Sequence, residues 1–180
     1  MRDVSPKPPT HIDLKELIEF LYEFIKKPVE KIALLPNWNW PSLFAVQIVL
    51  ALVSGTLAGL IKLNFYRIAF GFFIMPVVST LAALLLAMFL YYYFQFFEGR
   101  VESFRKILTL VILSSIPFYL FQILSEYFAP VTLIGFAFTS LLGIIGLSEN
   151  FAVERKRSYQ IVGLLFVLVF VAWIGNRYSS

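Results

Sequence analysis

Hydrophobic residues along this chain gather in five long runs, and the charged residues lie between the runs or at their ends. The runs cover residues 42–61, 68–95, 106–126, 130–147 and 159–175. A helix of about 20 residues is about 30 Å long, which is the thickness of the hydrocarbon core of a bilayer. The runs therefore predict an all-α polytopic membrane protein. Its five-transmembrane-helix bundle would occupy residues 42–176, with a short tail at residues 177–180.

Residues 1–41 have a different pattern and are expected to form a cytoplasmic N-terminal segment. Within it, residues 11–27 have the spacing of an amphipathic helix, and Thr10 with Asp13 forms a capping pair at its start. Six residues make up its apolar face: Leu14, Leu17, Ile18, Leu21, Phe24 and Ile25. The opposite face is too rich in lysine and glutamate to cross a bilayer. This helix could lie on the cytoplasmic leaflet, bind a protein partner, or pack against the cytoplasmic ends of the spans.

Two tryptophans precede the first apolar run. Trp38 and Trp40 lie between Pro36 and Pro41, directly before residue 42. Tryptophan is enriched where membrane meets water, because its ring is apolar and its N–H is polar. The pair predicts an interfacial anchor.

Small residues recur at intervals of four in two of the runs. Such faces let helices approach closely, and we expect packing within the chain, with homo-oligomerisation as the alternative. The residues concerned are Gly55 and Gly59 in the first run, and Gly135, Thr139 and Gly143 in the fourth, where Gly146 follows three residues later.

Prolines interrupt two of the runs. Pro76 is expected to kink the second run, which is longer than one perpendicular span requires. Pro117 lies in the middle of the third run and removes a backbone hydrogen bond there. The hydroxyls of Ser114 and Ser115 are close enough in sequence to satisfy the carbonyls that the proline frees. We therefore predict helix kinks at Pro76 and at Ser115 with Pro117.

Lysine and arginine are unevenly distributed between the two sides that five spans define. Twelve of the fifteen fall on the side of the N-terminal segment, and three fall on the other side. The positive-inside rule then predicts a cytoplasmic N-terminus and an external C-terminus, in the inner membrane if the protein is prokaryotic. The cations are scattered over span ends rather than gathered on one face, so the expected partner is the lipid bilayer and not nucleic acid.

Composition offers little catalytic chemistry. The chain is 59% hydrophobic and 14% charged, has no cysteine, and carries no Asp, Glu, Lys, Arg or His in the interiors of its apolar runs. The single histidine, His11, lies in the N-terminal segment, and Glu126 lies in the turn between the third and fourth runs. We therefore expect no catalytic, cofactor or metal site and no enzymatic activity. A lipid-handling enzyme that used Glu126 or His11 is the remaining enzymatic alternative.

Several features occur in the order typical of one known family. Pro28 follows an amphipathic stretch, Gly99 precedes Phe104-Arg105-Lys106, Ser115-Ile116-Pro117 breaks the third run, and the fourth run ends in Leu142-Gly143-Ile144-Ile145-Gly146-Leu147. Over residues 25–173 the chain resembles the Yip domain family, named for interaction with Ypt/Rab GTPases, and particularly its bacterial and archaeal members. That resemblance implies five transmembrane helices and a cytoplasmic N-terminus. The chain lacks the Asp-Leu-Tyr-Gly-Pro and Gly-Tyr-Gly signatures of the eukaryotic members that act in Golgi and endoplasmic-reticulum traffic.

Together these observations indicate a non-catalytic membrane adaptor or organiser that presents its N-terminal helix to the cytoplasmic leaflet or to a protein partner. The alternative is a small transporter or channel subunit for a neutral solute or a lipid.

Overall fold

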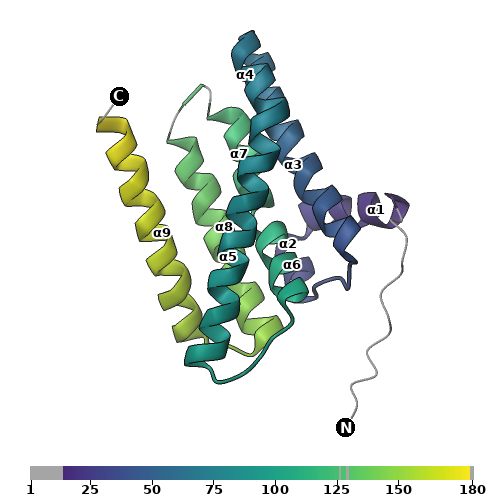
Figure 1. Cartoon of the computed structure of the whole chain (residues 1–180), viewed down its shortest axis with the longest axis vertical. Helices are drawn as coiled ribbons and strands as arrows, with labels where there is room; N and C mark the ends of the chain where they lie inside the picture. The colour runs from purple at the N-terminus through teal and green to yellow at the C-terminus, as the bar shows by residue number, and fades with distance from the viewer. Residues whose placement is uncertain (1–13, 126, 129, 179–180) are drawn as a thin grey trace.

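The computed structural model describes residues 14–125, 127–128 and 130–178, and every regular element in them is a helix. The elements are α1 (Leu14–Lys26), α2 (Pro28–Ala33), α3 (Trp40–Ile61), α4 (Phe65–Ala69), the π-helix η1 (Phe70–Ile74), α5 (Met75–Phe97), α6 (Phe104–Ser114), α7 (Ile116–Leu124), α8 (Val131–Phe151) and α9 (Arg155–Tyr178). The long helices run along the molecule, and α1 lies across their direction (Figure 1).

Among the described residues, four helical stretches are long and apolar enough to cross a bilayer, and two of them combine consecutive helices. They are Trp40–Ile61, Phe65–Phe97, Phe104–Leu124 and Val131–Phe151. The protein is thus an all-α polytopic membrane protein. The sequence predicted five spans, and the fifth corresponds to α9, which is helical but has some side chains outside the described set. A membrane crossing by α9 stays a prediction.

Polar caps explain why the first two spans begin earlier than their hydropathy indicated. The Asn39 Oδ1 accepts from the backbone N–H of Ser42 at 2.8 Å, which starts α3 at Trp40. The Asn64 Oδ1 accepts from the N–H of Arg67 at 3.1 Å, which starts α4 at Phe65. Asparagine at this position satisfies a backbone N–H that the helix itself leaves unpaired. The predicted capping pair Thr10 and Asp13 lies outside the described residues.

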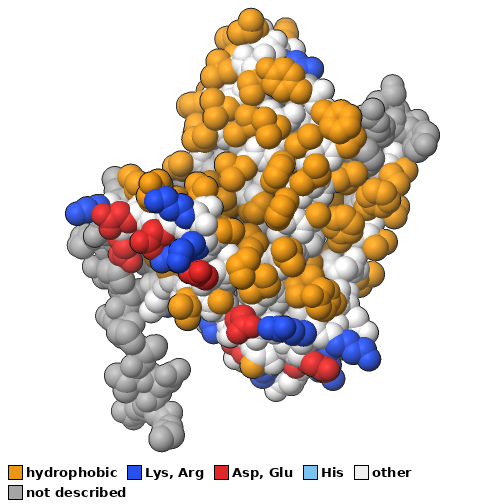
Figure 2. Space-filling view, turned by 180° about the vertical axis from the view of Figure 1, so that it is seen from behind, with side chains coloured by type: hydrophobic (Ala, Val, Ile, Leu, Met, Phe, Trp, Pro, Cys, Tyr) orange, Lys and Arg blue, Asp and Glu red, His pale blue; other side chains and the backbone are white. Residues whose placement is uncertain are grey.

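Helix α6 is the most buried of these elements. All eight of its residues from Ile107 to Ser114 are buried, among α3, α5 and α8. The other long helices leave apolar side chains uncovered on their outer faces, and Figure 2 shows these covering the middle of the molecule. Charged side chains gather at one end and on the lobe formed by α1 and α2 (Figure 2). A broad apolar surface bordered by charged groups is the surface that a bilayer solvates.

Candidate functional site

The α1–α2 platform, residues 14–33, docks on the bundle through one part of its apolar face. Leu17 and Phe24 of α1 and Ile32 of α2 are buried. Pro28 takes the first turn of α2, where its missing N–H costs nothing, and the chain changes direction there. Each buried side chain of this size contributes about 1.5–3 kcal/mol of hydrophobic free energy.

Asn150 at the end of α8 ties the platform to the spans. Its Nδ2 donates to the carbonyl of Ile32 at 2.8 Å, and its Oδ1 accepts from the N–H of Leu35 at 3.2 Å. These bonds satisfy both backbone groups next to the C-terminus of α2. Nothing in the sequence pattern singles out this asparagine.

The rest of the apolar face of α1 is uncovered. Ile18, Tyr22 and Ile25 are 66%, 61% and 59% exposed and follow one another at helical spacing, as an outer stripe. Ile18 and Ile25 were predicted to share one face with Leu17 and Phe24, but the structure divides that face between protein contact and exposure. Leu21 is partly buried, and the side chain of Leu14 lies outside the described set.

Charged groups border the outer stripe. The Lys26 Nζ lies 3.9 Å from the centre of the Tyr22 ring, and Lys15 pairs with Glu19 at 3.9 Å. Lys31 of α2 donates to the Glu23 carboxylate, and this hydrogen bond is the main reason why the pKa of Glu23 lies below its ordinary value. The platform therefore combines an apolar stripe with lysines beside it, the composition of a helix that lies in a membrane interface.

The two tryptophans have different surroundings. Trp38 is only 5% exposed and meets the Phe20 ring edge-on, with ring centres 5.0 Å apart. A lipid anchor at Trp38 does not fit this buried position, because the ring packs against α1. Trp40 is 42% exposed and stacks on Phe104 with ring centres 6.1 Å apart, so interfacial anchoring remains a prediction for Trp40.

Basic residues at the same end of the bundle bond to the C-terminus of α8. Arg100 donates to the carbonyl of Phe151, and the Lys106 Nζ donates to the carbonyl of Asn150 at 2.6 Å. Cations are favoured there because the last carbonyls of a helix lack intrahelical partners and carry partial negative charge. Arg157 adds an ion pair with Glu98 at 2.9 Å. The basic residues that indicated topology in the sequence therefore also join helix ends.

The first small-residue face lies against α4 and η1. A side chain on Gly55 would meet the Cα of Gly71 at 2.8 Å, and one on Gly59 would meet the backbone of Ile68 at 2.6 Å. Gly71 completes this close crossing, and no four-residue repeat in the sequence points to it.

The fourth-span glycines also face other parts of the chain. Gly135 lies close to Phe121, and Gly146 leaves no room for a side chain beside Leu110. A Cβ on Gly143 would meet only Val162, at 3.8 Å, which is an ordinary contact. Close packing within the chain thus already uses the faces of Gly55, Gly59, Gly135 and Gly146. This disfavours homo-oligomerisation through these glycines.

Both predicted kink sites coincide with breaks in regular α-helix. Pro76 follows η1, a turn of π-helix that accommodates the backbone hydrogen bond that the proline cannot make. At the second site α6 ends at Ser114 and α7 starts at Ile116. The Oγ atoms of Ser114 and Ser115 donate to the carbonyl of Val111 at 3.1 and 2.7 Å, rather than to the Leu113 carbonyl that Pro117 frees. A functional role for the kinks at Pro76 and at Ser115 with Pro117 stays a prediction.

A buried polar network joins α3 to α7 near the middle of the spans. The Gln47 Nε2 donates to the Tyr119 hydroxyl at 2.7 Å, and the Ser54 Oγ donates to the backbone carbonyl of Tyr119 at 2.7 Å. Polar groups inside a membrane protein pair in this way because lipid offers them no partner.

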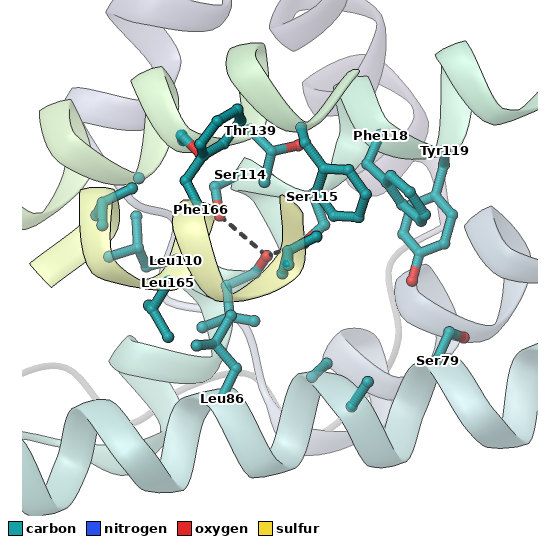
Figure 3. Close-up of a pocket in the computed structure, with 18 of the residues that line it drawn as sticks. Ser79, Leu86, Leu110, Ser114, Ser115, Phe118, Tyr119, Thr139, Leu165 and Phe166 are labelled. Atoms are coloured by element: carbon teal, nitrogen blue, oxygen red, sulfur yellow. Dashed lines mark hydrogen bonds between the residues drawn. The ribbon is translucent and has the colours of Figure 1, made fainter. Parts of the chain in front are cut away.

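A cavity of about 460 Å³ lies between α5, α6, α7, α8 and α9. Most of its lining is apolar, and Figure 3 shows Leu86, Leu110, Phe118 and Phe166 around it. Six hydroxyl groups interrupt the apolar lining: those of Ser79, Ser114, Ser115, Tyr119, Thr139 and Ser140. No charged side chain lines it among the residues that the structure describes.

The described part of the chain contains no group of three His, Asp or Glu side chains placed to hold a metal ion. Both residues of the enzymatic alternative, His11 and Glu126, lie outside it. The platform and the cavity are therefore the two features on which a function can be built.

Comparison with known proteins gives one match. The family model described as the Yip1 domain matches residues 23–175, which is most of the chain. The chain belongs to the Yip1 domain family. No curated protein and no solved structure matches it.

The Yip1 match begins in the second half of α1 and extends into α9. Both the α2 docking contacts and the cavity thus belong to the Yip1 domain. Membership makes this a multi-pass membrane protein of a non-enzymatic family, in agreement with its apolar helices.

Proposed function

We propose that this protein is a non-catalytic organiser of the cytoplasmic leaflet, and that the outer stripe of α1 is its working surface. The observation that carries the proposal is the exposure of Ile18, Tyr22 and Ile25 beside the charged side chains of a helix already docked on the bundle. In this arrangement the spans hold the helix at the membrane, and the stripe is free to enter the lipid.

Physical chemistry favours lipid as the occupant of the stripe. An apolar side chain that leaves water completely gains about 1.5–3 kcal/mol, and three neighbouring side chains act together. Lysines near an anionic leaflet add about 1 kcal/mol each, and Lys15, Lys26 and Lys27 lie on α1 or directly after it. A helix wedged between headgroups changes the packing of the leaflet it enters.

This proposal includes a cytoplasmic N-terminus and an external C-terminus. Helix α9 begins at the end of the molecule where the α5–α6 and α8–α9 connections lie and runs toward the opposite end (Figure 1). These connections carry the ion pairs Arg100–Glu102 and Arg155–Glu149, and the charged lobe of α1 and α2 lies beside the bundle (Figure 2). The distribution of lysine and arginine then assigns the end with these connections to the cytoplasm.

The alternative of a transporter or channel subunit has less support. The cavity is lined mostly by apolar side chains, with six hydroxyl groups among them. A water-filled path for a polar solute would need polar groups along its length.

Site-directed labelling tests whether the stripe lies in lipid. The chain has no cysteine, so single substitutions Ile18→Cys, Ile25→Cys and Glu19→Cys each introduce one reactive site. In proteoliposomes with anionic lipid, a spin label at residue 18 or 25 should be relaxed by oxygen and shielded from a water-soluble nickel complex. The label at residue 19, on the charged face, should show the reverse. Equal accessibility of all three sites to the nickel complex would overturn the proposal.

A measurement of lipid order tests the proposed organising activity. Full-length protein reconstituted at a fixed protein-to-lipid ratio should lower lipid order in the leaflet that α1 contacts, measured with a headgroup-region fluorescent probe. The triple variant Ile18→Ser/Tyr22→Ser/Ile25→Ser should lose this effect. A control with Val167→Ser/Leu168→Ser/Val171→Ser alters three exposed apolar residues of α9 and should keep it. Identical behaviour of wild type and the α1 variant would contradict the proposed function.

A further inference from the structure

We propose that the cavity between α5, α6–α7, α8 and α9 is a binding site for an uncharged long-chain lipid that bears a hydroxyl group. The site is independent of the outer stripe, because it is built from different helices.

The size of the cavity suits one hydrocarbon chain. An engineered apolar cavity of about 150 Å³ holds one benzene molecule, so 460 Å³ offers room for about 18 carbon atoms. It also lies within the range of about 300–1,000 Å³ that is usual for ligand sites.

The cavity is reached from the bilayer. Helix α9 packs on α8, whereas α5 packs on α3, η1 and α6. Val162, Leu165 and Val169 of α9 therefore face Val78 and Leu86 of α5 across the cavity instead of closing it. A lipid chain moving in the hydrocarbon core could enter between α5 and α9 without crossing water.

The hydroxyl groups select the polar part of the ligand. Thr139 lines the cavity, and its buried Oγ1 has no hydrogen-bond partner, so its O–H is not committed to the protein. The Ser114 and Ser115 hydroxyls already donate to the carbonyl of Val111, so only their lone pairs remain free. Thr139, Ser114 and Ser115 line the same cavity (Figure 3). A ligand hydroxyl can both accept from the threonine and donate to a serine oxygen, whereas an ether or a hydrocarbon cannot do both.

The depth of these groups excludes a charged ligand head. Ser114 lies ten residues from the start of α6, or about 15 Å along it, which is half the hydrocarbon thickness. A phosphate or carboxylate there would be a buried charge, and the described lining residues offer no cation to pair with it. A phospholipid could only place an acyl chain in the cavity, with its headgroup outside.

Photolabelling of the full-length protein in nanodiscs tests the site. The probes are a diazirine-bearing alcohol of about 18 carbons, the matching alkane, and a phosphatidylcholine with the diazirine on its acyl chain. We expect the alcohol to label peptides from α5, α8 and α9 at least fivefold more than the other two. Equal labelling by all three probes would show filling by bilayer chains only and would overturn the proposal.

Two glycine variants separate the cavity from the lipid-facing surface. Gly143→Leu places a side chain in the cavity without a backbone clash, since only Val162 lies within 4 Å of its Cβ. Gly163→Leu makes the same change on α9, where nothing lies within 4 Å. Alcohol labelling should fall about tenfold in Gly143→Leu and be unchanged in Gly163→Leu. Equal labelling of the two variants would overturn the proposal.

Thr139→Val tests the hydroxyl selection. Loss of one hydrogen bond should reduce the preference for alcohol over alkane about fivefold, and alkane labelling should stay the same. Thr132→Val on the same helix, outside the cavity lining, is the control. If both variants keep the preference, Thr139 does not select the ligand and the hydroxyl assignment is wrong. Because Thr139 has no partner to lose, this variant remains informative even if Gly143→Leu folds poorly.

Discussion

Asn150 and Ile32 lie 118 residues apart in the chain and are joined by a hydrogen bond of 2.8 Å from the side-chain amide to the backbone carbonyl. The same asparagine accepts from the N–H of Leu35 at 3.2 Å. One side chain at the end of α8 thus holds the turn that follows α2. This contact and the buried side chains of Leu17, Phe24 and Ile32 link the α1–α2 platform to the spans.

Asn150→Ala should loosen the platform and leave the spans intact. It leaves two backbone groups of the α2 turn without these partners, at a cost of about 1–3 kcal/mol for each group left unpaired. Amide hydrogen exchange in residues 28–35 should accelerate at least fivefold, while exchange in α6 is unchanged. Gln160→Ala, at an exposed position of α9, is the control. Unchanged exchange in residues 28–35 would show that apolar docking alone holds the platform.

Gly71→Leu should destabilise the crossing of η1 with α3. A side chain on Gly71 would overlap the backbone carbonyl of Gly55, and backbone cannot move aside as a flexible side chain can. We expect a loss of about 1–3 kcal/mol or more, seen as a lower midpoint of thermal unfolding in detergent. Gly163→Leu should leave the midpoint within experimental error, because its Cβ meets open space. A similar midpoint for both variants would contradict the close crossing.

Tyr119→Phe should weaken the link between α3 and α7. It removes the hydroxyl that accepts from Gln47 at 2.7 Å and leaves this buried amide unpaired. Hydrogen bonds between transmembrane helices contribute about 0.6 kcal/mol on average and up to about 1.7. Unfolding by a denaturing detergent should report a loss in that range.

The double variant Gln47→Leu/Tyr119→Phe tests whether the loss of stability in Tyr119→Phe comes from its hydrogen bond with Gln47. Since it removes both partners, it should be more stable than the sum of the two single losses predicts. Tyr92→Phe, on an exposed ring of α5, controls for the loss of a hydroxyl elsewhere. Strict additivity of the two single changes would mean that Gln47 and Tyr119 do not interact.

The Glu23–Lys31 pair should make the platform sensitive to acid. Lys31 lowers the pKa of Glu23 below 4.5, so the pair stabilises the folded platform above that pH. This contribution is lost as the pH falls through the lowered pKa. Carboxyl chemical shifts in micelles should give a pKa for Glu23 below its ordinary value. Lys31→Gln should raise that pKa, and Lys15→Gln, which changes the partner of Glu19, should not. An ordinary pKa for Glu23 in the unaltered protein would rule out the pair.

Much of the fold could be predicted from the sequence because bilayer thickness alone determines the length of a span. The run at residues 42–61 coincides with α3 except for two residues that the Asn39 cap adds. The proline breaks fall where expected, because proline lacks an N–H in any surroundings. Family membership could also be predicted, since it depends on the order of such local features.

The contacts that make the candidate sites could not be predicted. Leu17 is buried and Ile18 is exposed, yet both are apolar members of one amphipathic helix. The cavity likewise depends on a separation between α5 and α9, and the residue types in the sequence do not predict this separation.

The sequence by itself determined that the chain is helical, where its apolar spans lie, and which ends carry the basic residues. Tertiary structure decided which apolar side chains meet protein and which are left for lipid. It also decided that Asn150 holds the platform and that Gly71 meets Gly55. The reason is physical: lipid and protein interior are both apolar, so hydropathy cannot distinguish a side chain that faces one from a side chain that faces the other.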